Sequence, residues 1–367
     1  MHILMTADTV GGVWTYAREL VTGLASRGHT VTLVSFGKRA TPEQVSWMKG
    51  LRNVDYRETE YRLEWMQGSA EDIEKSTIFL IELIRQVHPD VLHLNQFAYG
   101  ALATDLPKIV VAHSDVISWW SNVHDEGPPD TPWIRWYRDL VAKGIHSADV
   151  VLAPSKWMLD AIRTHYGNPA RSAVVHNARS ASLFSERARK ENCALTVGRL
   201  WDPAKQVSLL MKRLHSIPVY VAGQIENPEN LPGAHSLLQG SSSIRLLGTQ
   251  SEEQLRACYA KCAIYVATSR YEPFGLAPLE AALSGCALVL NDIETFRELW
   301  DDAACYFQRN DSESLAAEIE RLAADAKLRE RYARYAFERA SSNFRLDSML
   351  DSYQHLYTSL VTQEAYA

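Results

Sequence analysis

The chemically most suggestive stretch of this chain, residues 271–281, holds two glutamates, Glu272 and Glu280, eight positions apart. An apolar, strand-like run precedes it, and Pro278 suits the first turn of a following helix. At such a junction, backbone N–H groups and the positive end of the helix dipole point at one spot, which favours a phosphate. A carboxylate on each side can hold hydroxyls. The combination suits a sugar joined to a nucleoside diphosphate.

Two cations, Arg199 and Lys205, stand six positions apart after another strand-like run. Arginine offers a planar fork and lysine a point charge, and diphosphate binding uses both. As isolated residues they are more often solvated surface charges. Because the same sheet is expected to carry the paired glutamates, we interpret Arg199 and Lys205 as diphosphate ligands.

A glycine pair and a histidine stand at strand ends in the first half of the chain. Gly11 and Gly12 form either a tight turn or a loop whose backbone approaches a phosphate or sugar. His113 ends an apolar run, where open α/β sheets bind their ligands. A core or capping role is the alternative, and we interpret His113 as a hydrogen-bond partner of a sugar hydroxyl or phosphate.

Two adjacent tryptophans, Trp119 and Trp120, follow His113. Most tryptophans in this region are expected to pack in the core. These two could stack on a sugar ring or on an aromatic or lipid acceptor, and we keep that role as a hypothesis.

Short apolar runs alternate with amphipathic stretches, the pattern of parallel strands with crossover helices. Expected strands in the first half are residues 3–6, 29–34, 91–95, 109–113, 150–153 and 173–176, with helices at 13–27, 69–87 and 156–165. After a polar stretch, 177–191, strands follow at 194–197, 218–222, 244–246, 263–268 and 286–290, and the C-terminal end is helical. We expect an α/β fold with two parallel-sheet, Rossmann-like domains, which suits a length of 367 residues.

Composition excludes several classes of protein. The net charge of −6 argues against nucleic-acid binding and a purely electrostatic membrane anchor. The five cysteines fit neither a disulfide framework nor a zinc site. No apolar run reaches the roughly 18–20 residues of a membrane helix, and the first residues lack a secretory pattern. We expect a cytoplasmic protein, and peripheral contact with the inner membrane face stays open.

A dehydrogenase with two dinucleotide-binding domains is the simplest rival. The first turn carries adjacent glycines instead of the spaced glycines of a dinucleotide fingerprint, and the run 29–34 is followed by no acid to hold a ribose. The rival is therefore weak.

The chain resembles the retaining, GT-B-fold glycosyltransferases of family 4. The matching elements are Gly11-Gly12, His113, 175–177, 197–200 with Lys205, 221–223, 246–248, Tyr259, 269–276 with Glu280, and Phe344, Tyr353 and Tyr357. They cover nearly the whole chain in the family's order. The resemblance implies an acceptor-side domain at 1–178, a donor-side domain at 179–345 across a cleft, and a helix at 346–367 returning to the first domain.

The resemblance also implies roles for the charged residues. Arg199 and Lys205 would neutralise the donor diphosphate. Glu280 would hold the ribose hydroxyls, and Glu272 would contact the donor sugar near its reacting end.

The remaining donor-binding groups are implied in the same way. Backbone N–H groups of Phe274, Gly275 and Leu276 would bind sugar or phosphate, together with the Gly11-Gly12 loop. His113 would face the donor sugar.

The expected reaction moves a hexose from a nucleotide diphosphate sugar, with retention, to a saccharide, lipid-linked or small-molecule acceptor in polysaccharide or glycoconjugate synthesis. UDP-glucose is the expected donor by resemblance and GDP-mannose the runner-up. No metal or cofactor is expected, because Arg199 and Lys205 can stabilise the leaving diphosphate. A nucleotide-sugar epimerase and a non-catalytic nucleotide-sugar sensor remain the alternatives.

Three departures from the family pattern stand out: Asn177-Ala178-Arg179 where the family commonly has Asn-Gly, Trp201 after Arg-Leu, and Gln206 in place of the usual glycine after the lysine. Acceptor choice is expected to depend on loops at 40–70 and 115–135.

Overall fold

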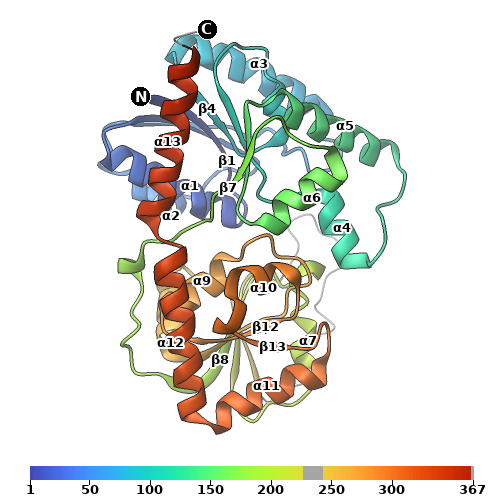
Figure 1. Cartoon of the computed structure of the whole chain (residues 1–367), viewed down its shortest axis with the longest axis vertical. Helices are drawn as coiled ribbons and strands as arrows, with labels where there is room; N and C mark the ends of the chain where they lie inside the picture. The colour runs from blue at the N-terminus through green and yellow to red at the C-terminus, as the bar shows by residue number, and fades with distance from the viewer. Residues whose placement is uncertain (226–242, 365–367) are drawn as a thin grey trace. The chain divides into compact units, whose positions relative to one another are not determined.

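The computed structural model describes residues 1–225 and 243–364. The chain divides into two compact units, which are described separately: unit 1 is Met1–Ala178 with Leu346–Ala367, and unit 2 is Arg179–Arg345. Each unit is built on one parallel sheet (Figure 1). The expected fold class, GT-B with two Rossmann-like sheets, is therefore confirmed for the sheets themselves.

Unit 1 has a seven-stranded sheet in the order β3-β2-β1-β4-β5-β6-β7. Its strands are β1 (His2–Asp8), β2 (Thr30–Phe36), β3 (Val54–Glu58), β4 (Val91–Leu94), β5 (Lys108–Val111), β6 (Val150–Ala153) and β7 (Ser172–Val174). Its helices are α1 (Gly12–Ser26), α2 (Pro42–Val45), η1 (Ser46–Met48), α3 (Ala70–Val87), η2 (Phe97–Ala101), α4 (Val116–His124), α5 (Pro132–Ser147), α6 (Lys156–Tyr166) and α13 (Leu346–Glu364).

Apolar side chains cover both faces of this sheet, because alternate residues of each buried strand point to opposite sides. One core joins the sheet to α1 and the C-terminal helix α13. The other joins it to α3, α5 and α6. In the second core, the backbones of α5 and η2 pack directly against each other. A Cβ added at Gly144 of α5 would lie 1.8 Å from the carbonyl oxygen of Phe97 in η2. Only glycine fits there.

A buried polar network ties α13 to unit 1. The Tyr16 hydroxyl donates to the Tyr353 hydroxyl at 2.5 Å, and the His93 ring contacts Tyr16 (3.2 Å) and Tyr357 (2.7 Å). Burial, and then the nearby His113, lowers the pKa of His93 to about 3, so this ring is neutral and its network stays uncharged. Figure 1 shows α13, in red, beside the sheet of unit 1.

Unit 2 has a six-stranded parallel sheet in the order β10-β9-β8-β11-β12-β13. Its strands are β8 (Glu191–Val197), β9 (Val219–Ala222), β10 (Ile244–Gly248), β11 (Cys262–Ala267), β12 (Ala287–Asn291) and β13 (Cys305–Phe307). Its helices are η3 (Ala181–Leu183), η4 (Pro203–Lys205), α7 (Ser208–Met211), α8 (Glu252–Lys261), α9 (Leu276–Leu283), α10 (Glu294–Trp300), η6 (Asp301–Ala303), α11 (Ser312–Ala324) and α12 (Ala326–Asn343).

Two cores again sandwich the sheet, one with α8, α9, α10 and α12 and one with α7 and α11. In both units the sheet order reverses beside the first strand, so β1 lies next to β4 and β8 next to β11. Open α/β sheets bind ligands at the carboxyl ends of the strands at this switch point.

Every expected strand overlaps an observed one, but two observed strands were not predicted. β3 is an edge strand with half-buried and exposed residues, and β13 has only three residues, so neither carries a strong apolar pattern. The expectation of loops at 40–70 and 115–135 was wrong in part. The first contains α2, η1 and β3, and the second contains α4, whose N-cap Asp115 accepts from Ser118 N.

Within residues 1–225 and 243–364, no helix combines the length and apolarity needed to cross a bilayer.

Candidate active site

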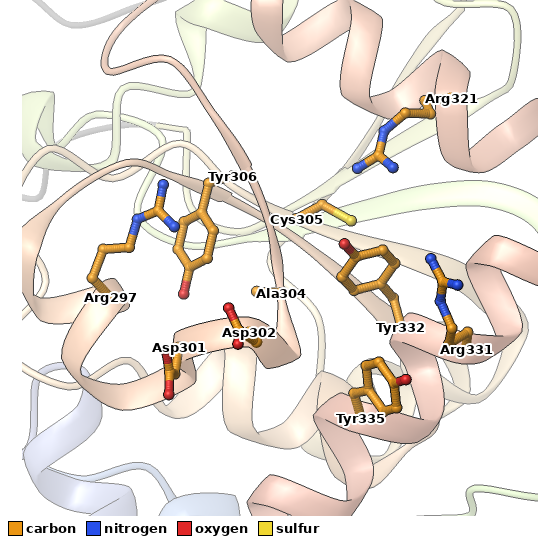
Figure 2. Close-up of a pocket in the computed structure, with 10 residues that line it drawn as sticks. All are labelled: Arg297, Asp301, Asp302, Ala304, Cys305, Tyr306, Arg321, Arg331, Tyr332 and Tyr335. Carbon is orange, nitrogen blue, oxygen red and sulfur yellow. The ribbon is translucent and has the colours of Figure 1, made fainter.

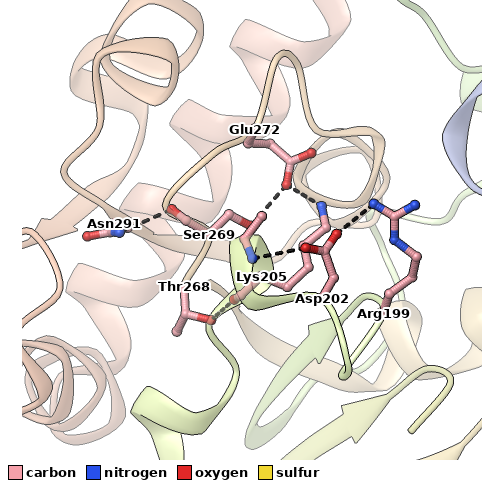
Figure 3. Close-up of polar contacts among 8 residues, drawn as sticks. Arg199, Asp202, Lys205, Thr268, Ser269, Glu272 and Asn291 are labelled. Atoms are coloured by element: carbon pink, nitrogen blue, oxygen red, sulfur yellow. Dashed lines mark hydrogen bonds and ion pairs between the residues drawn. The ribbon is translucent and has the colours of Figure 1, made fainter. Parts of the chain in front are cut away.

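The candidate site of unit 2 is built from the loops that follow β8 and β11. These strands are neighbours, so Lys205 after β8 and Glu272 after β11 meet, with Lys205 Nζ 2.6 Å from Glu272 Oε2 (Figure 3). The lysine side chain is 21% exposed and the glutamate 13% exposed. The pair is thus partly shielded from water yet open to a ligand.

Arg199 lies in the same loop. Its guanidinium Nη2 is 2.7 Å from Asp202 Oδ2 and stacks over the Trp201 ring, 5.4 Å from its centroid. Asp202 is itself the cap of η4, accepting from Ala204 N at 2.9 Å. With 40% of its side chain exposed, Arg199 keeps part of its fork of donors accessible (Figure 3).

The lysine backbone is held in place by the neighbouring strand. The Thr268 hydroxyl donates to the Lys205 carbonyl at 2.7 Å, and Arg270 N donates to the Ala204 carbonyl at 2.8 Å. Gln206, where the family has glycine, adopts φ 47°, a left-handed conformation that explains the usual glycine. A non-glycine residue in this conformation costs some backbone strain.

The glutamate loop is equally fixed. The Ser269 hydroxyl donates to Glu272 Oε2 at 3.0 Å, and the buried Asn291 amide at the end of β12 donates to the Ser269 carbonyl at 3.1 Å. Phe274 is buried edge-on against Phe344, with ring centroids 5.2 Å apart. These contacts order the loop before a ligand arrives.

The predicted backbone donors lie at the start of α9. Gly275, its N-cap, has φ 90°, and an added Cβ would come within 3.2 Å of Glu272 and Pro278. Leu276 is the first helical residue, so N–H groups of this turn have no intrahelical acceptor. Glycine is favoured at position 275 for two reasons: the positive φ angle, and the short distance to the Glu272 side chain.

Glu280, on α9, contacts two buried residues. Arg179 Nε lies 2.8 Å from Glu280 Oε1, and the same guanidinium reaches Glu252 Oε1 at 2.7 Å. The pKa of the buried Tyr259 hydroxyl is raised by desolvation first and then by the Glu280 carboxylate beside it. Glu280 remains 14% exposed.

In unit 1, Asn95 fixes the tautomer of His113. The Asn95 amide nitrogen is 2.6 Å from the Thr6 carbonyl and must donate to it, so its oxygen accepts from His113 Nε2 at 2.7 Å. His113 Nδ1 is then the acceptor nitrogen of the ring. Burial lowers the pKa of His113 to about 3, so the ring is neutral near pH 7 although part of it is exposed.

The glycine pair begins α1 at the carboxyl end of β1. Gly11 is the N-cap with φ 82° and ψ −146°, a conformation open mainly to glycine, and Gly12 is the first helical residue. The adjacent Asp8 accepts from Val10 N at 2.6 Å and shapes this turn. Since β1 pairs with β4, whose end precedes Asn95, the turn belongs to the switch point of its sheet.

Trp119 and Trp120 are half-buried on α4. Their ring centroids are 6.3 Å apart, and both rings pack against His124. Their proposed stacking on an acceptor stays a prediction.

Sequence reasoning did not predict four residues that surround the predicted site residues, namely Arg179, Asp202 and Glu252 in unit 2 and Asn95 in unit 1. They carry no local pattern that separates them from ordinary polar residues. Ser269, which contacts Glu272, lies in the stretch 269–276 that carries the family resemblance.

A separate hollow of about 400 Å³ lies elsewhere in unit 2 (Figure 2). Its lining includes Arg297, Asp302, Tyr306 and Tyr332, and Cys305 at the start of β13. It therefore opens at the amino end of that strand. None of the predicted site residues lines it.

The comparisons with protein families cover nearly the whole chain. The model of Glycosyltransferase Family 4 matches residues 10–182, and that of Glycosyl transferases group 1 matches residues 180–339. The chain belongs to glycosyltransferase family 4. The expected family is confirmed, and this glycosyltransferase carries Arg199, Lys205, Glu272 and Glu280 in its group 1 part.

Curated relatives of the glycosyltransferase differ in their named activities. The O-antigen chain mannosyltransferase RfbU of Salmonella typhimurium is 26% identical over an alignment of 231 residues. That match covers 59% of this chain and 65% of the relative, under two thirds of its length. The glycogen synthase of Mycobacterium tuberculosis is 24% identical over 385 residues, covering 94% of this chain and 91% of that relative.

Among solved structures, Anabaena Alr3699/HepE in complex with UDP-glucose matches the glycosyltransferase with a TM-score of 0.76. The identity is 17%, and the match covers 98% of this chain and 100% of the other. At this identity the likeness shows the shared GT-B fold.

Proposed function

We propose that this glycosyltransferase moves a hexose, with retention and without a metal, from a nucleotide diphosphate sugar to a saccharide, lipid-linked or small-molecule acceptor. The observation that carries the proposal is the meeting of Lys205 and Glu272, with Arg199 close by in sequence, at the switch point of the second sheet. These groups suit a diphosphate leaving group and a sugar hydroxyl, respectively.

Arg199 and Lys205 stabilise the charge that develops on the leaving diphosphate. In a partly shielded site, fixed charges act more strongly than in water and need no reorganisation during the reaction. The N–H groups of Phe274, Gly275 and Leu276 add partial positive charge at the start of α9. This set of donors supports leaving-group departure without a metal.

The two glutamates take different roles in the proposal. Glu272, beside the lysine, accepts hydrogen bonds from hydroxyls of the donor sugar, and Glu280 accepts from the ribose hydroxyls. Both are partly exposed carboxylates held by neighbours, so each can accept from a ligand without first being ordered.

In the proposed reaction, the bond between the anomeric carbon and the diphosphate oxygen breaks while an acceptor hydroxyl oxygen bonds to the same face of that carbon. The acceptor proton passes to the departing phosphate oxygen, which serves as base. The sugar keeps its anomeric configuration, and a nucleoside diphosphate is released.

Residues of unit 1 have polar and steric roles in this account. His113 is a neutral ring whose Nδ1 accepts from a donor-sugar hydroxyl, because Asn95 holds the proton on Nε2. The Gly11-Gly12 turn lets the backbone approach the donor. Trp119 and Trp120 stack on the acceptor.

UDP-glucose is the proposed donor. It is supported by the family resemblance, and a UDP-glucose complex is known for the structurally similar Anabaena HepE. GDP-mannose is the second candidate, favoured by the similarity to the mannosyltransferase RfbU. A thermal-shift panel of UDP- and GDP-sugars distinguishes them, since a ligand that binds only the folded protein raises Tm.

The activity is tested with a labelled donor from that panel and candidate saccharide and lipid-linked acceptors. Release of nucleoside diphosphate with transfer of label, and a retained anomeric configuration by NMR, are expected. An isomerised donor would point to an epimerase, and binding without turnover to a sensor. Loss of activity with EDTA, restored by Mn²⁺ or Mg²⁺, would contradict the metal-free account.

We also propose that the protein acts in the cytoplasm in polysaccharide or glycoconjugate synthesis, with peripheral membrane contact when its acceptor is lipid-linked. Cell fractionation of the tagged protein, with and without a salt wash, tests this location.

A further inference from the structure

The first residue of unit 2 carries a buried cation next to the proposed ribose ligand. Arg179 has a side chain only 1% exposed, and its guanidinium lies between two carboxylates, 2.8 Å from Glu280 and 2.7 Å from Glu252. It also lies 5.5 Å from the centroid of the Phe184 ring. Burying a guanidinium is unfavourable unless its partners are well placed, so the positions of Glu280 and Glu252 are constrained by this contact.

We propose that Arg179 is a positioning residue that fixes the Glu280 carboxylate for the ribose hydroxyls. The inference rests on the proposed role of Glu280.

The position of the guanidinium supports this role. Nη2 donates to Glu252 at 2.7 Å, and Nε forms an ion pair with Glu280 at 2.8 Å, so one rigid group contacts two side chains from different helices, α9 and α8. The contact with Arg179 removes rotamer freedom from the Glu280 side chain when the protein folds. Ligand binding then no longer has to order this side chain, which favours affinity.

The remaining capacity of Glu280 suits a diol. A carboxylate has about four lone-pair sites, and Arg179 engages Oε1. The neighbouring Tyr259 hydroxyl is fully buried. Because 14% of the Glu280 side chain remains exposed, its carboxylate stays open to ribose hydroxyls.

Charge supports the same conclusion. Arg179 is a single cation shared by two glutamates. An ionised carboxylate only accepts hydrogen bonds, as binding two hydroxyl donors requires. Removing the arginine leaves Glu280 and Glu252 without their common cation, and the Glu280 side chain free to turn.

The test compares ligands that differ only in the ribose hydroxyls. Calorimetry gives Kd values for UDP and 2′,3′-dideoxy-UDP, or for the guanosine pair if the protein prefers GDP. Wild type is expected to favour the hydroxylated ligand by about tenfold or more, the worth of a hydrogen bond to a charged group. In Arg179→Met that preference falls below about threefold, while the Kd of the dideoxy ligand stays within about threefold.

Three variants control the measurement. Glu280→Gln should lose the same preference, and Arg179→Met with Glu280→Gln should lose no more than either alone, because both act through one contact. Glu252→Gln removes only the outer partner and should keep the preference. Arg331→Met, at an exposed arginine on α12, should change neither Kd.

If Arg179→Met fails to fold, Arg179→Lys is the deciding variant. A single ammonium cannot reproduce the planar fork, so the preference should still fall by about threefold or more. If the folded Met or Lys variant still prefers the hydroxylated ligand as strongly as wild type, or binds both ligands equally more weakly, the positioning role of Arg179 is refuted. The ribose role of Glu280 would be untouched by that result. A wild-type protein that does not distinguish the ligands would refute the ribose role of Glu280, and the inference with it.

Discussion

Replacing Lys205 with methionine should nearly abolish turnover while leaving the protein folded. Methionine keeps the apolar stem, which lies against Gly198: a Cβ added to that glycine would be 3.4 Å from Lys205 Cγ. The variant removes only the ammonium, which lies 2.6 Å from Glu272. Loss of one fixed group that stabilises transition-state charge typically lowers kcat by about 10²–10³-fold, or about 3–4 kcal/mol.

The effect on stability should be much smaller. Coulomb's law with an effective dielectric constant of about 20 gives roughly 6 kcal/mol for unit charges 2.6 Å apart. Desolvation of both groups offsets most of this attraction, so we expect the free energy of unfolding to fall by about 1–2 kcal/mol. The variant should therefore remain folded at 25 °C.

The assay is steady-state turnover of the donor identified by thermal shift, together with urea unfolding of the same preparations. Lys212→Met, an exposed lysine at the end of α7, is the matched control and should keep wild-type kcat. A folded Lys205→Met enzyme with kcat within about threefold of wild type would refute the assigned role, because its leaving-group charge would then be stabilised elsewhere.

Three further predictions concern residues of unit 1. Burial, despite backbone N–H bonds from Ala98 and Phe97, raises the pKa of Glu64 from 4.5 to about 7, equivalent to about 3 kcal/mol. The contribution of a carboxyl whose pKa is raised on folding is present at low pH and is lost as pH rises between these values. The free energy of unfolding of wild type relative to Glu64→Gln should thus fall from pH 5 to 8 by up to about 3 kcal/mol; a constant difference in urea melts would contradict the shift. Because the pKa of His113 is about 3, His113 should not titrate near pH 6.5. The pH profiles of kcat for wild type and His113→Asn should therefore have the same shape around that pH. Gly144→Ala should lower the free energy of unfolding by about 2–3 kcal/mol, since its Cβ would meet the Phe97 carbonyl, whereas Gly127→Ala, with open space around it, should change it by less than about 0.5 kcal/mol in the same melts.

The arrangement of the polar core under α13 could not be predicted from periodicity. The sequence resemblance includes Tyr353 and Tyr357 in the last helix, but their partners Tyr16 and His93 lie more than two hundred residues away. Residues so far apart in the chain share no local sequence pattern from which their contact could be predicted. The same holds for the edge strand β3, which pairs with β2 although its residues are largely polar.

The sequence by itself determined the two parallel sheets and the family, because strand periodicity, turn glycines and the order of motifs are all encoded by residues near one another in the chain. It also predicted that Arg199, Lys205 and Glu272 follow strands. Only the tertiary structure decided which of these side chains meet. Lys205 reaches Glu272 across 67 positions because β8 and β11 are adjacent in the sheet, and Arg179 reaches Glu280 because α9 packs near the start of unit 2. Strand order and helix packing set these contacts, and the energy that fixes them comes from burial of both sheet faces, which no short stretch of sequence contains.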